Sequence, residues 1–119
     1  MPVRRVDKQP QELVGFEYHN GEYEWSEFYS DKGVYAVCGV TLNHPTEMWM
    51  YWRILAPSIS AWRDLKRNVV PHWQQYARDN GKKFVVVQTD DPNDTHFTKM
   101  VELMEFKNHR VRRTSWQEV

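Results

Sequence analysis

The 119-residue sequence is poor in cysteine and in glycine, with one and five residues respectively, and its 16 basic and 16 acidic side chains cancel. A single thiol, Cys38, excludes an internal disulfide framework. Zero net charge leaves no overall field that would draw the protein onto nucleic acid or an anionic membrane. The sequence therefore excludes a disulfide-stapled fold and disfavours DNA or RNA as a partner.

Long hydrophobic runs are also missing. No apolar stretch approaches the roughly 18 residues that a membrane-spanning helix needs, and the first residues lack the charged-then-apolar pattern of a secretory leader. We therefore expect a soluble, non-secreted protein that is not bound to a membrane. The length fits one domain over residues 1–119. Residues 1–33 carry the weakest pattern, with a hairpin expected only around the turn dipeptide Asn20-Gly21.

Aromatic residues are abundant, with six Trp, six Tyr and five Phe. Large aromatic side chains fill cores, and they are also enriched at protein–protein interfaces. Two interpretations stay open: the tryptophans fill the core of a small domain, or some of them serve a partner surface. Low net charge weakens self-repulsion, so a homo-oligomer is compatible with the composition.

The clearest strand pattern begins at Val34. Residues 34–43 alternate and are rich in β-branched side chains. A turn at 43–46 and a second strand at 47–56 complete an antiparallel hairpin, which Pro57 ends. Strict alternation predicts one face with Val34, Ala36, Cys38 and Val40, and the other with Tyr35, Val37, Gly39 and Thr41.

A helix is predicted after Pro57, with Ser58 or Ser60 as its N-cap and Gly81 as its stop. Pro71 lies inside it and is expected to kink it, because proline lacks an amide donor and clashes with the preceding turn. The apolar residues recur at helical spacing, namely Trp62, Leu65, Val69, Trp73 and Tyr76.

The remaining residues predict a buried strand at 83–89, a second helix from Asp94 or Thr95 to Met104, and one or two strands over 106–119. A helix that connects two neighbouring strands usually makes them parallel, with a right-handed crossover. The fold class is therefore α+β (mixed α/β), with two main helices packed on a mixed sheet of about five to six strands.

This order of elements resembles the GNAT family of N-acetyltransferases over about Val34 to Phe106. Leu55–Pro57 is similar to the hydrophobic-x-Pro that ends a hairpin strand in that family. Residues 76–89 look like its helix end, glycine and following strand, and residues 93–106 look like its last helix. The resemblance implies a long helix whose N-terminus holds the pyrophosphate of acetyl-CoA.

A nearer resemblance is to small GNAT-like proteins of tailed bacteriophages, some of which are internal virion proteins. It is carried by the Trp-rich hairpin, the missing glycines and an Asn-x-x-His loop from Asn93 to His96. This resemblance implies a location in the host cytoplasm or the virion, and a partner that is a protein or a virion assembly.

The sequence departs from the family at its cofactor loop, Arg/Gln-x-x-Gly-x-Gly/Ala. Counted from Pro57, the arginine position holds Ser60 and the two glycine positions hold Arg63 and Leu65. Glycines allow backbone amides to approach phosphates closely, so we expect the two larger side chains to occupy that space. In the second helix, the family's general-acid tyrosine position holds Val101, which has no proton to donate.

The family's Gly-Phe signature after this helix is retained only in part. Its glycine position holds Glu105, whereas Phe106 remains. Phe106 therefore supports the resemblance, whereas Glu105 departs from it.

If acetyl-CoA binds, the candidate cofactor-binding residues are Ser60, Arg63, Lys66 and Arg67. They lie in the first turns of the long helix, whose N-terminus carries partial positive charge. Their alternative role is a solvated helix face. The candidate general bases are Glu47 and His96, whose alternatives are an exposed turn residue and a residue at a helix cap.

Other candidate chemistry is weaker. The five histidines lack metal-ligand spacing, so no metal site is predicted. Cys38 is predicted to be a packed core thiol. The basic run at 107–113 is interpreted as a charged edge strand, with local phosphate contact as the alternative.

Two functional hypotheses result. The first is a GNAT-like, phage-type protein with a degenerate acetyl-CoA site and no cofactor, which acts non-catalytically through protein contacts as a virion component or a host-factor binder. The alternative is an active acetyl-CoA-dependent N-acetyltransferase with a divergent cofactor loop. Loss of the loop glycines and of the tyrosine favours the first hypothesis.

Overall fold

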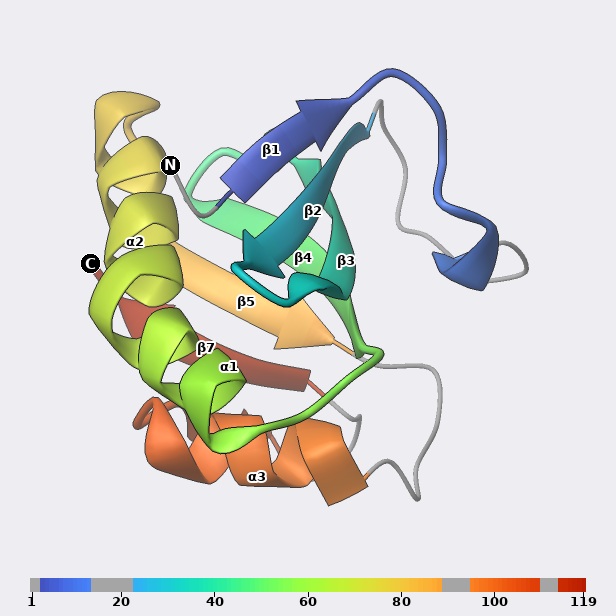
Figure 1. Cartoon of the computed structure of the whole chain (residues 1–119). Helices are drawn as coiled ribbons and strands as arrows, with labels where there is room; N and C mark the ends of the chain where they lie inside the picture. Colours follow the sequence, from blue (N-terminus) through green and yellow to red (C-terminus); the bar gives the residue numbers. More distant parts are fainter. Residues whose placement is uncertain (1–2, 14–22, 89–94, 110–113) are drawn as a thin grey trace.

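The computed structural model describes residues 3–13, 23–88, 95–109 and 114–119. Within these ranges, seven strands form one mixed sheet in the order β1-β2-β3-β4-β5-β7-β6 (Figure 1). Strands β4 and β5 are parallel, and every other neighbouring pair is antiparallel. The strands are β1 (Val3–Val6), β2 (Glu24–Ser30), β3 (Gly33–Thr41), β4 (Glu47–Ile54), β5 (Phe84–Gln88), β6 (Lys107–His109) and β7 (Thr114–Glu118).

The helical elements lie between β4 and β7, apart from one 3-10 turn near the N-terminus. The first long helix consists of α1 (Ile59–Asp64), the π-helical segment η2 (Leu65–Val69) and α2 (Val70–Asp79), and the second is α3 (Thr95–Leu103). The 3-10 turn is η1 (Gln11–Leu13). The predicted α+β class, with a mixed sheet and two main helices, is confirmed. Strands β1 and β2 lie in the stretch for which the sequence predicted little, and the hairpin expected at Asn20-Gly21 lies outside the described residues.

One face of the sheet packs against both helices and holds most of the core. The buried set on this side includes Phe28, Met50 and Trp52 from the strands, Leu65 and Trp73 from the first helix, and Met100 and Val101 from α3. Alternate residues of β4 point to this side, as a strand with a period of two requires. The sheet face that packs against the helices is therefore buried from solvent.

The opposite face has a smaller cluster, in which Leu13 of η1 covers Val37 and Tyr51. On the same face the ring of Trp25 lies directly on Gly39. A Cβ atom at position 39 would lie 2.5 Å from a Trp25 ring carbon, well inside van der Waals contact. Glycine at this position therefore lets an aromatic side chain approach the sheet backbone.

A β-bulge at Tyr35 corrects the predicted face assignment. Phe28 pairs with Ala36 while Tyr29 pairs with Val34, so Tyr35 is the extra residue in β3. Its carbonyl oxygen accepts hydrogen bonds from the amides of both Leu55 and Ala56, at 2.7 and 3.1 Å. The bulge shifts the alternation of side chains before it. Tyr35 joins Ala36 in the helix-side core, whereas Val34 packs against the cluster on the opposite face, so both predicted positions are wrong.

The first long helix accommodates Pro71 without ending. The amide of Val70 donates to the carbonyl of Leu65, a bond that spans five residues, and the π-helical segment precedes Pro71 directly. Such a π-turn re-spaces the carbonyls, and irregularities of this kind typically accompany proline in helices. The structure thus shows a change of helix type before Pro71, and the predicted kink stays a prediction.

Both long helices end in a left-handed residue. Gly81 has φ +72° at the end of α2, as predicted. At the end of α3, Glu105 adopts φ +61°, and the Phe106 amide donates to the Val101 carbonyl at 3.0 Å. Position 105 therefore keeps the backbone shape that glycine favours, although a side chain is present. None of the helices described here has the length and apolar character that crossing a membrane requires.

Candidate functional site

At the start of α1, where the resemblance places a cofactor, the side chain of Ser58 caps the helix. Ser58 is the N-cap, with an extended backbone, and its Oγ accepts a hydrogen bond from the Ala61 amide at 3.1 Å. The Ser60 hydroxyl lies 3.1 Å from the Ser58 hydroxyl. The choice left open between Ser58 and Ser60 is thus settled for Ser58, which takes an amide that would otherwise be free for an anion.

The residues at the family's loop positions are helical. Ser60 and Arg63 lie in α1, and Leu65 begins η2 with no exposed surface. The expectation that Leu65 fills the phosphate space is wrong, because the helix carries its side chain into the core beside Ala61 and Val69. Without loop glycines the chain starts its helix early, since the substituted residues have helical propensity and Ser58 caps them.

Three of the four candidate cofactor-binding residues line one open pocket of about 310 Å³, and Lys66 does not. The other wall of this pocket is the turn between β2 and β3. The lining residues are Ser30, Asp31, Ser60, Arg63, Asp64, Arg67 and Asn68. We call this hollow the β2–α1 pocket.

A hydrogen-bond network anchors the floor of the β2–α1 pocket. The Tyr35 hydroxyl donates to Asp64 Oδ2 at 2.6 Å, and Asn68 Nδ2 donates to Asp64 Oδ1 at 2.8 Å. Burial raises the pKa of Tyr35 well above its usual value, and the hydrogen bond to Asp64 adds to the shift. Both carboxylate oxygens of Asp64 therefore have donors within the protein.

A second pocket, of about 190 Å³, lies between α2 and the strands β1 and β2. In it the Tyr76 hydroxyl donates to Glu24 Oε2 at 2.7 Å, and Arg5 forms an ion pair with Glu24 at 3.5 Å. Burial raises the pKa of Tyr76 to about 12, with the hydrogen bond to Glu24 as a further cause. Burial lowers the pKa of His72 at the pocket wall, so that imidazole is neutral at pH 7.

The Tyr76–Glu24 hydrogen bond predicts a loss of stability at alkaline pH. The folded-state pKa of Tyr76 lies above the unfolded value near 10. Its stabilising contribution is therefore complete below pH 10 and declines as the pH approaches 12. We expect the stability difference between wild type and Tyr76→Phe to shrink over this range in urea denaturation.

The matched control for this experiment is Tyr29→Phe, at a tyrosine that accepts a cation–π contact from Arg4. This variant removes a tyrosine hydroxyl away from Glu24, and its pH profile is the reference for Tyr76→Phe. A stability difference for Tyr76→Phe that does not shrink between pH 10 and 12 would contradict the assignment.

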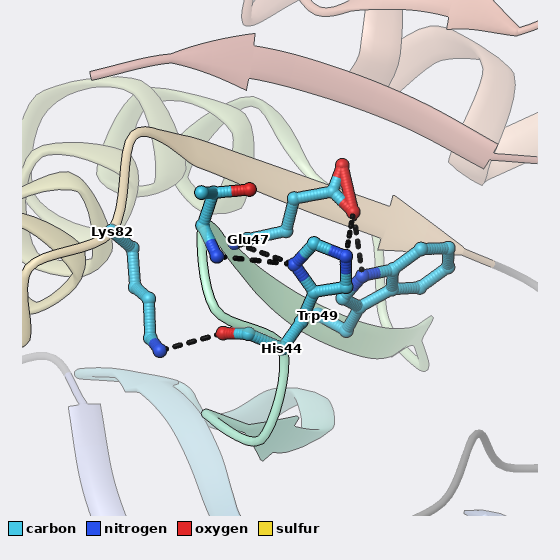
Figure 2. Close-up of polar contacts among 5 residues, drawn as sticks. His44, Glu47, Trp49 and Lys82 are labelled. Atoms are coloured by element: carbon cyan, nitrogen blue, oxygen red, sulfur yellow. Dashed lines mark hydrogen bonds and ion pairs between the residues drawn. The ribbon is translucent and has the colours of Figure 1, made fainter.

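The candidate base Glu47 is the first residue of β4, and its carboxylate contacts Trp49 and His44 (Figure 2). Trp49 Nε1 donates to Glu47 Oε1 at 3.2 Å, and His44 Nε2 lies 3.3 Å from the same oxygen. His44 Nδ1 accepts the amides of Thr46 and Glu47, each at 3.1 Å. Because Nδ1 is an acceptor, neutral His44 carries its proton on Nε2, the nitrogen that lies near Glu47.

The structure does not bring Glu47 and His96 together. Glu47 pairs with Phe84, the first residue of β5. His96 is exposed in the first turn of α3, which begins on the side of the sheet where the β5 arrow ends (Figure 1). The two candidate bases are therefore at opposite ends of the parallel strand pair.

Two further candidate positions, 101 and 38, offer no reactive group that solvent or a substrate can reach. Val101, at the family's tyrosine position, is 2% exposed within the core. Cys38 is fully buried, as predicted, and burial raises the pKa of its thiol. Among the described parts of the chain, no group of three or more His, Cys, Asp or Glu side chains is arranged to hold a metal ion.

The connection from β4 to α1 exposes apolar side chains. Ile59, the first residue of α1, is 78% exposed, and Leu55 is 39% exposed. Ala56 and Pro57 between them are also exposed. This apolar segment, Leu55–Ile59, lies where the resemblance would place a charged pyrophosphate.

No protein-family model matches the chain, and no curated protein matches its sequence. Solved structures do. A protein described as an acetyltransferase of the GNAT family from Desulfovibrio desulfuricans superposes with TM-score 0.57 at 15% identity, over 81% of this chain and 69% of that one. Aminoglycoside 6'-acetyltransferase type Ii gives TM-score 0.55 at 15% identity, over 84% of this chain and 70% of its own.

A third similar structure is an N-acetyltransferase from Staphylococcus aureus Mu50, with TM-score 0.50 at 12% identity over 82% of this chain and 67% of that one. All three superpose on more than four fifths of this chain, so the chain has the GNAT fold. At these identities the likeness establishes the fold and leaves the chemistry to the residues of the site.

Sequence reasoning missed the strand side of the β2–α1 pocket. Ser30 and Asp31 belong to a turn about thirty residues before the helix, and Tyr35 reaches Asp64 only because of the bulge. The Asp31-Lys32-Gly33 stretch carries a turn signal. Nothing in the local pattern indicates which helix it faces.

Proposed function

We propose that this chain is a GNAT-fold protein that does not use acetyl-CoA and acts non-catalytically through contacts with another protein. The observation that carries the proposal is the helical state of the former loop. Ser58 caps an amide that a phosphate would need, and Leu65 packs in the core. Because the same fold can serve different functions, a GNAT fold that lacks its phosphate-binding loop can still serve as a scaffold for protein binding.

The missing acid supports the same conclusion. Acyl transfer from a thioester needs a proton donor for the leaving thiolate. At the position where the family resemblance implies a tyrosine, this chain has the hydrocarbon side chain of Val101, buried in the core.

Exposed apolar surface supports the protein partner. The Leu55–Ile59 segment offers hydrocarbon to solvent beyond the C-terminal end of β4, a central strand of the sheet. On the face opposite the helices, Tyr23 and Trp25 are half-buried and stack with ring centroids 5.7 Å apart. Aromatic side chains of this kind are enriched at protein–protein interfaces. A structural place in a virion or a contact with a host factor both fit this chemistry.

The alternative is an active acetyltransferase, and its support is the fold shared with acetyltransferases. It would rely on Arg63, Lys66 and Arg67 to hold phosphates and on Glu47 or His96 as a base. Glu47 is engaged by His44 and Trp49, whereas His96 is exposed at the start of α3. We therefore place the non-catalytic function first.

The deciding experiment is thermal unfolding with and without 1 mM acetyl-CoA or CoA. A ligand at 100 times its dissociation constant stabilises a protein by about 2.7 kcal/mol, which raises the Tm of a domain of this size by several degrees. We expect no change in Tm. The aminoglycoside acetyltransferase, run in parallel, serves as the positive control.

A clear rise in Tm that disappears in Arg63→Glu would overturn the proposal and restore the enzyme hypothesis. Release of free CoA thiol from acetyl-CoA, at a rate that Glu47→Gln or His96→Ala lowers, would do the same.

A further inference from the structure

We propose that the outer face of α1 and the adjoining β2–α1 pocket form the docking site for an acidic, leucine-type segment of the partner protein. The inference rests on the proposed function and names its partner chemistry. The surface consists of Ile59, Arg63, Lys66 and Arg67, together with the pocket beside them. We call it the α1 docking face.

Helical spacing brings these side chains to one side. Residues 59, 63 and 67 are four apart, so they stand one above another on a helix. The buried residues Ala61 and Leu65 define the opposite side. The docking face therefore combines an apolar tip with a row of cations.

The three cations have no partner within the described chain. Ion pairs involving other basic residues join Arg4 to Glu27 and Arg5 to Glu24, and none involves Arg63, Lys66 or Arg67. Asp64, the nearest carboxylate on the helix, is occupied by Tyr35 and Asn68. In a protein with zero net charge, this leaves a local positive surface that complements an acidic segment.

The polar wall of the pocket fits a peptide better than a free anion. Asp31 and Ser30 line the pocket on the β2–β3 turn, across from the arginines, and Ser60 lies on the helix side. A phosphate would be repelled by the Asp31 carboxylate, whereas the backbone amides of a peptide can donate to it. An acidic peptide can thus place carboxylates on Arg63 and Arg67 and its backbone against the turn.

Ile59 adds an apolar anchor. Its side chain is 78% exposed at the first position of α1, although isoleucine is apolar and β-branched. Nucleic acid has no matching hydrocarbon on its backbone, whereas a leucine-bearing peptide does. The combination of hydrocarbon, arginines and a single acidic residue therefore favours a protein segment.

The experiment titrates the full chain with a synthetic twelve-residue peptide that carries two leucines flanked by four glutamates, using fluorescence anisotropy at 50 mM salt. We expect saturable binding to wild type. The double charge reversal Arg63→Glu with Arg67→Glu should weaken binding about tenfold or more, because it removes and reverses the complementary charges. Raising the salt to 300 mM should reduce this difference, since exposed charges are screened.

The matched control reverses two exposed cations elsewhere, Arg78→Glu with Lys83→Glu, so that the net charge changes equally. It should bind the peptide nearly as well as wild type. For the apolar contact, Ile59→Ser should weaken binding severalfold, while Leu103→Ser on α3 should not. Circular dichroism on every variant separates misfolding from loss of binding.

Several outcomes would overturn the inference. They are equal loss of binding in both charge-reversal pairs and no loss from Ile59→Ser. Displacement of the peptide by inorganic phosphate that supplies the same total negative charge would also overturn it, as would tighter binding of a DNA duplex than of the peptide. Absence of peptide binding to wild type would do so as well. Acetyl-CoA is tested separately by thermal unfolding, so a failure of the docking face and a failure of the non-catalytic function are distinguished.

Discussion

Replacement of Leu65 by alanine is expected to lower the free energy of unfolding by about 2–5 kcal/mol. Leu65 has no exposed surface and packs among residues of the helix-side core. Alanine has a helix propensity at least as high as leucine, so the loss reports packing alone. Urea denaturation followed by circular dichroism at 222 nm measures it.

The matched control is Leu103→Ala on α3. Leu103 is 39% exposed, so its truncation removes less buried surface and should cost less than half as much. Similar small losses for both variants would mean that Leu65 faces solvent beside the helix start. In that case the cofactor loop would be open, and the main support for the non-catalytic function would be lost.

Replacement of Trp52 by alanine is expected to cost about 3–5 kcal/mol. Trp52 is 1% exposed, and its ring meets Phe28 edge-on with centroids 4.9 Å apart. Its indole N–H donates to the sulfur of Met50 at 3.4 Å. Because a typical domain is stable by only 5–15 kcal/mol, this substitution removes a large fraction of the total.

The control for Trp52 is Trp49→Ala, three residues earlier on the same strand and on the opposite face of the sheet. Trp49 is half-buried and donates to Glu47. We expect it to cost clearly less than Trp52→Ala. Guanidinium denaturation should be followed by circular dichroism, since both substitutions change the tryptophan fluorescence. Equal losses would show that the two faces contribute alike to stability.

The local pattern predicted the elements from β3 to α3 well. Alternation identified β3 and β4, serine and glycine marked the ends of the first long helix, and β-branched residues identified the buried strand β5. These signals are local because they reflect backbone propensity and periodicity. The strands β1 and β2 were missed because neither has a regular apolar alternation: β1 is Val-Arg-Arg-Val, and β2 mixes charged, aromatic and serine side chains.

The candidate site was predicted less well than the fold. The sequence selected Ser60, Arg63 and Arg67, and these do share a pocket, whereas Lys66 lies outside it and Glu47 and His96 lie apart. Residue type suggests chemistry, but the distance between residues far apart in the chain depends on topology. Whether the candidates bind or catalyse stays a prediction.

The sequence by itself determined the order of the elements from β3 to α3, a serine cap at position 58 or 60, and the absence of loop glycines, because each depends on residues only a few positions apart. The tertiary structure alone decided that Leu65 turns into the core, that a bulge gives Tyr35 to Asp64, and that the β2–β3 turn faces α1. These are long-range contacts. They arise when one packed arrangement buries both helices on a single face of the sheet.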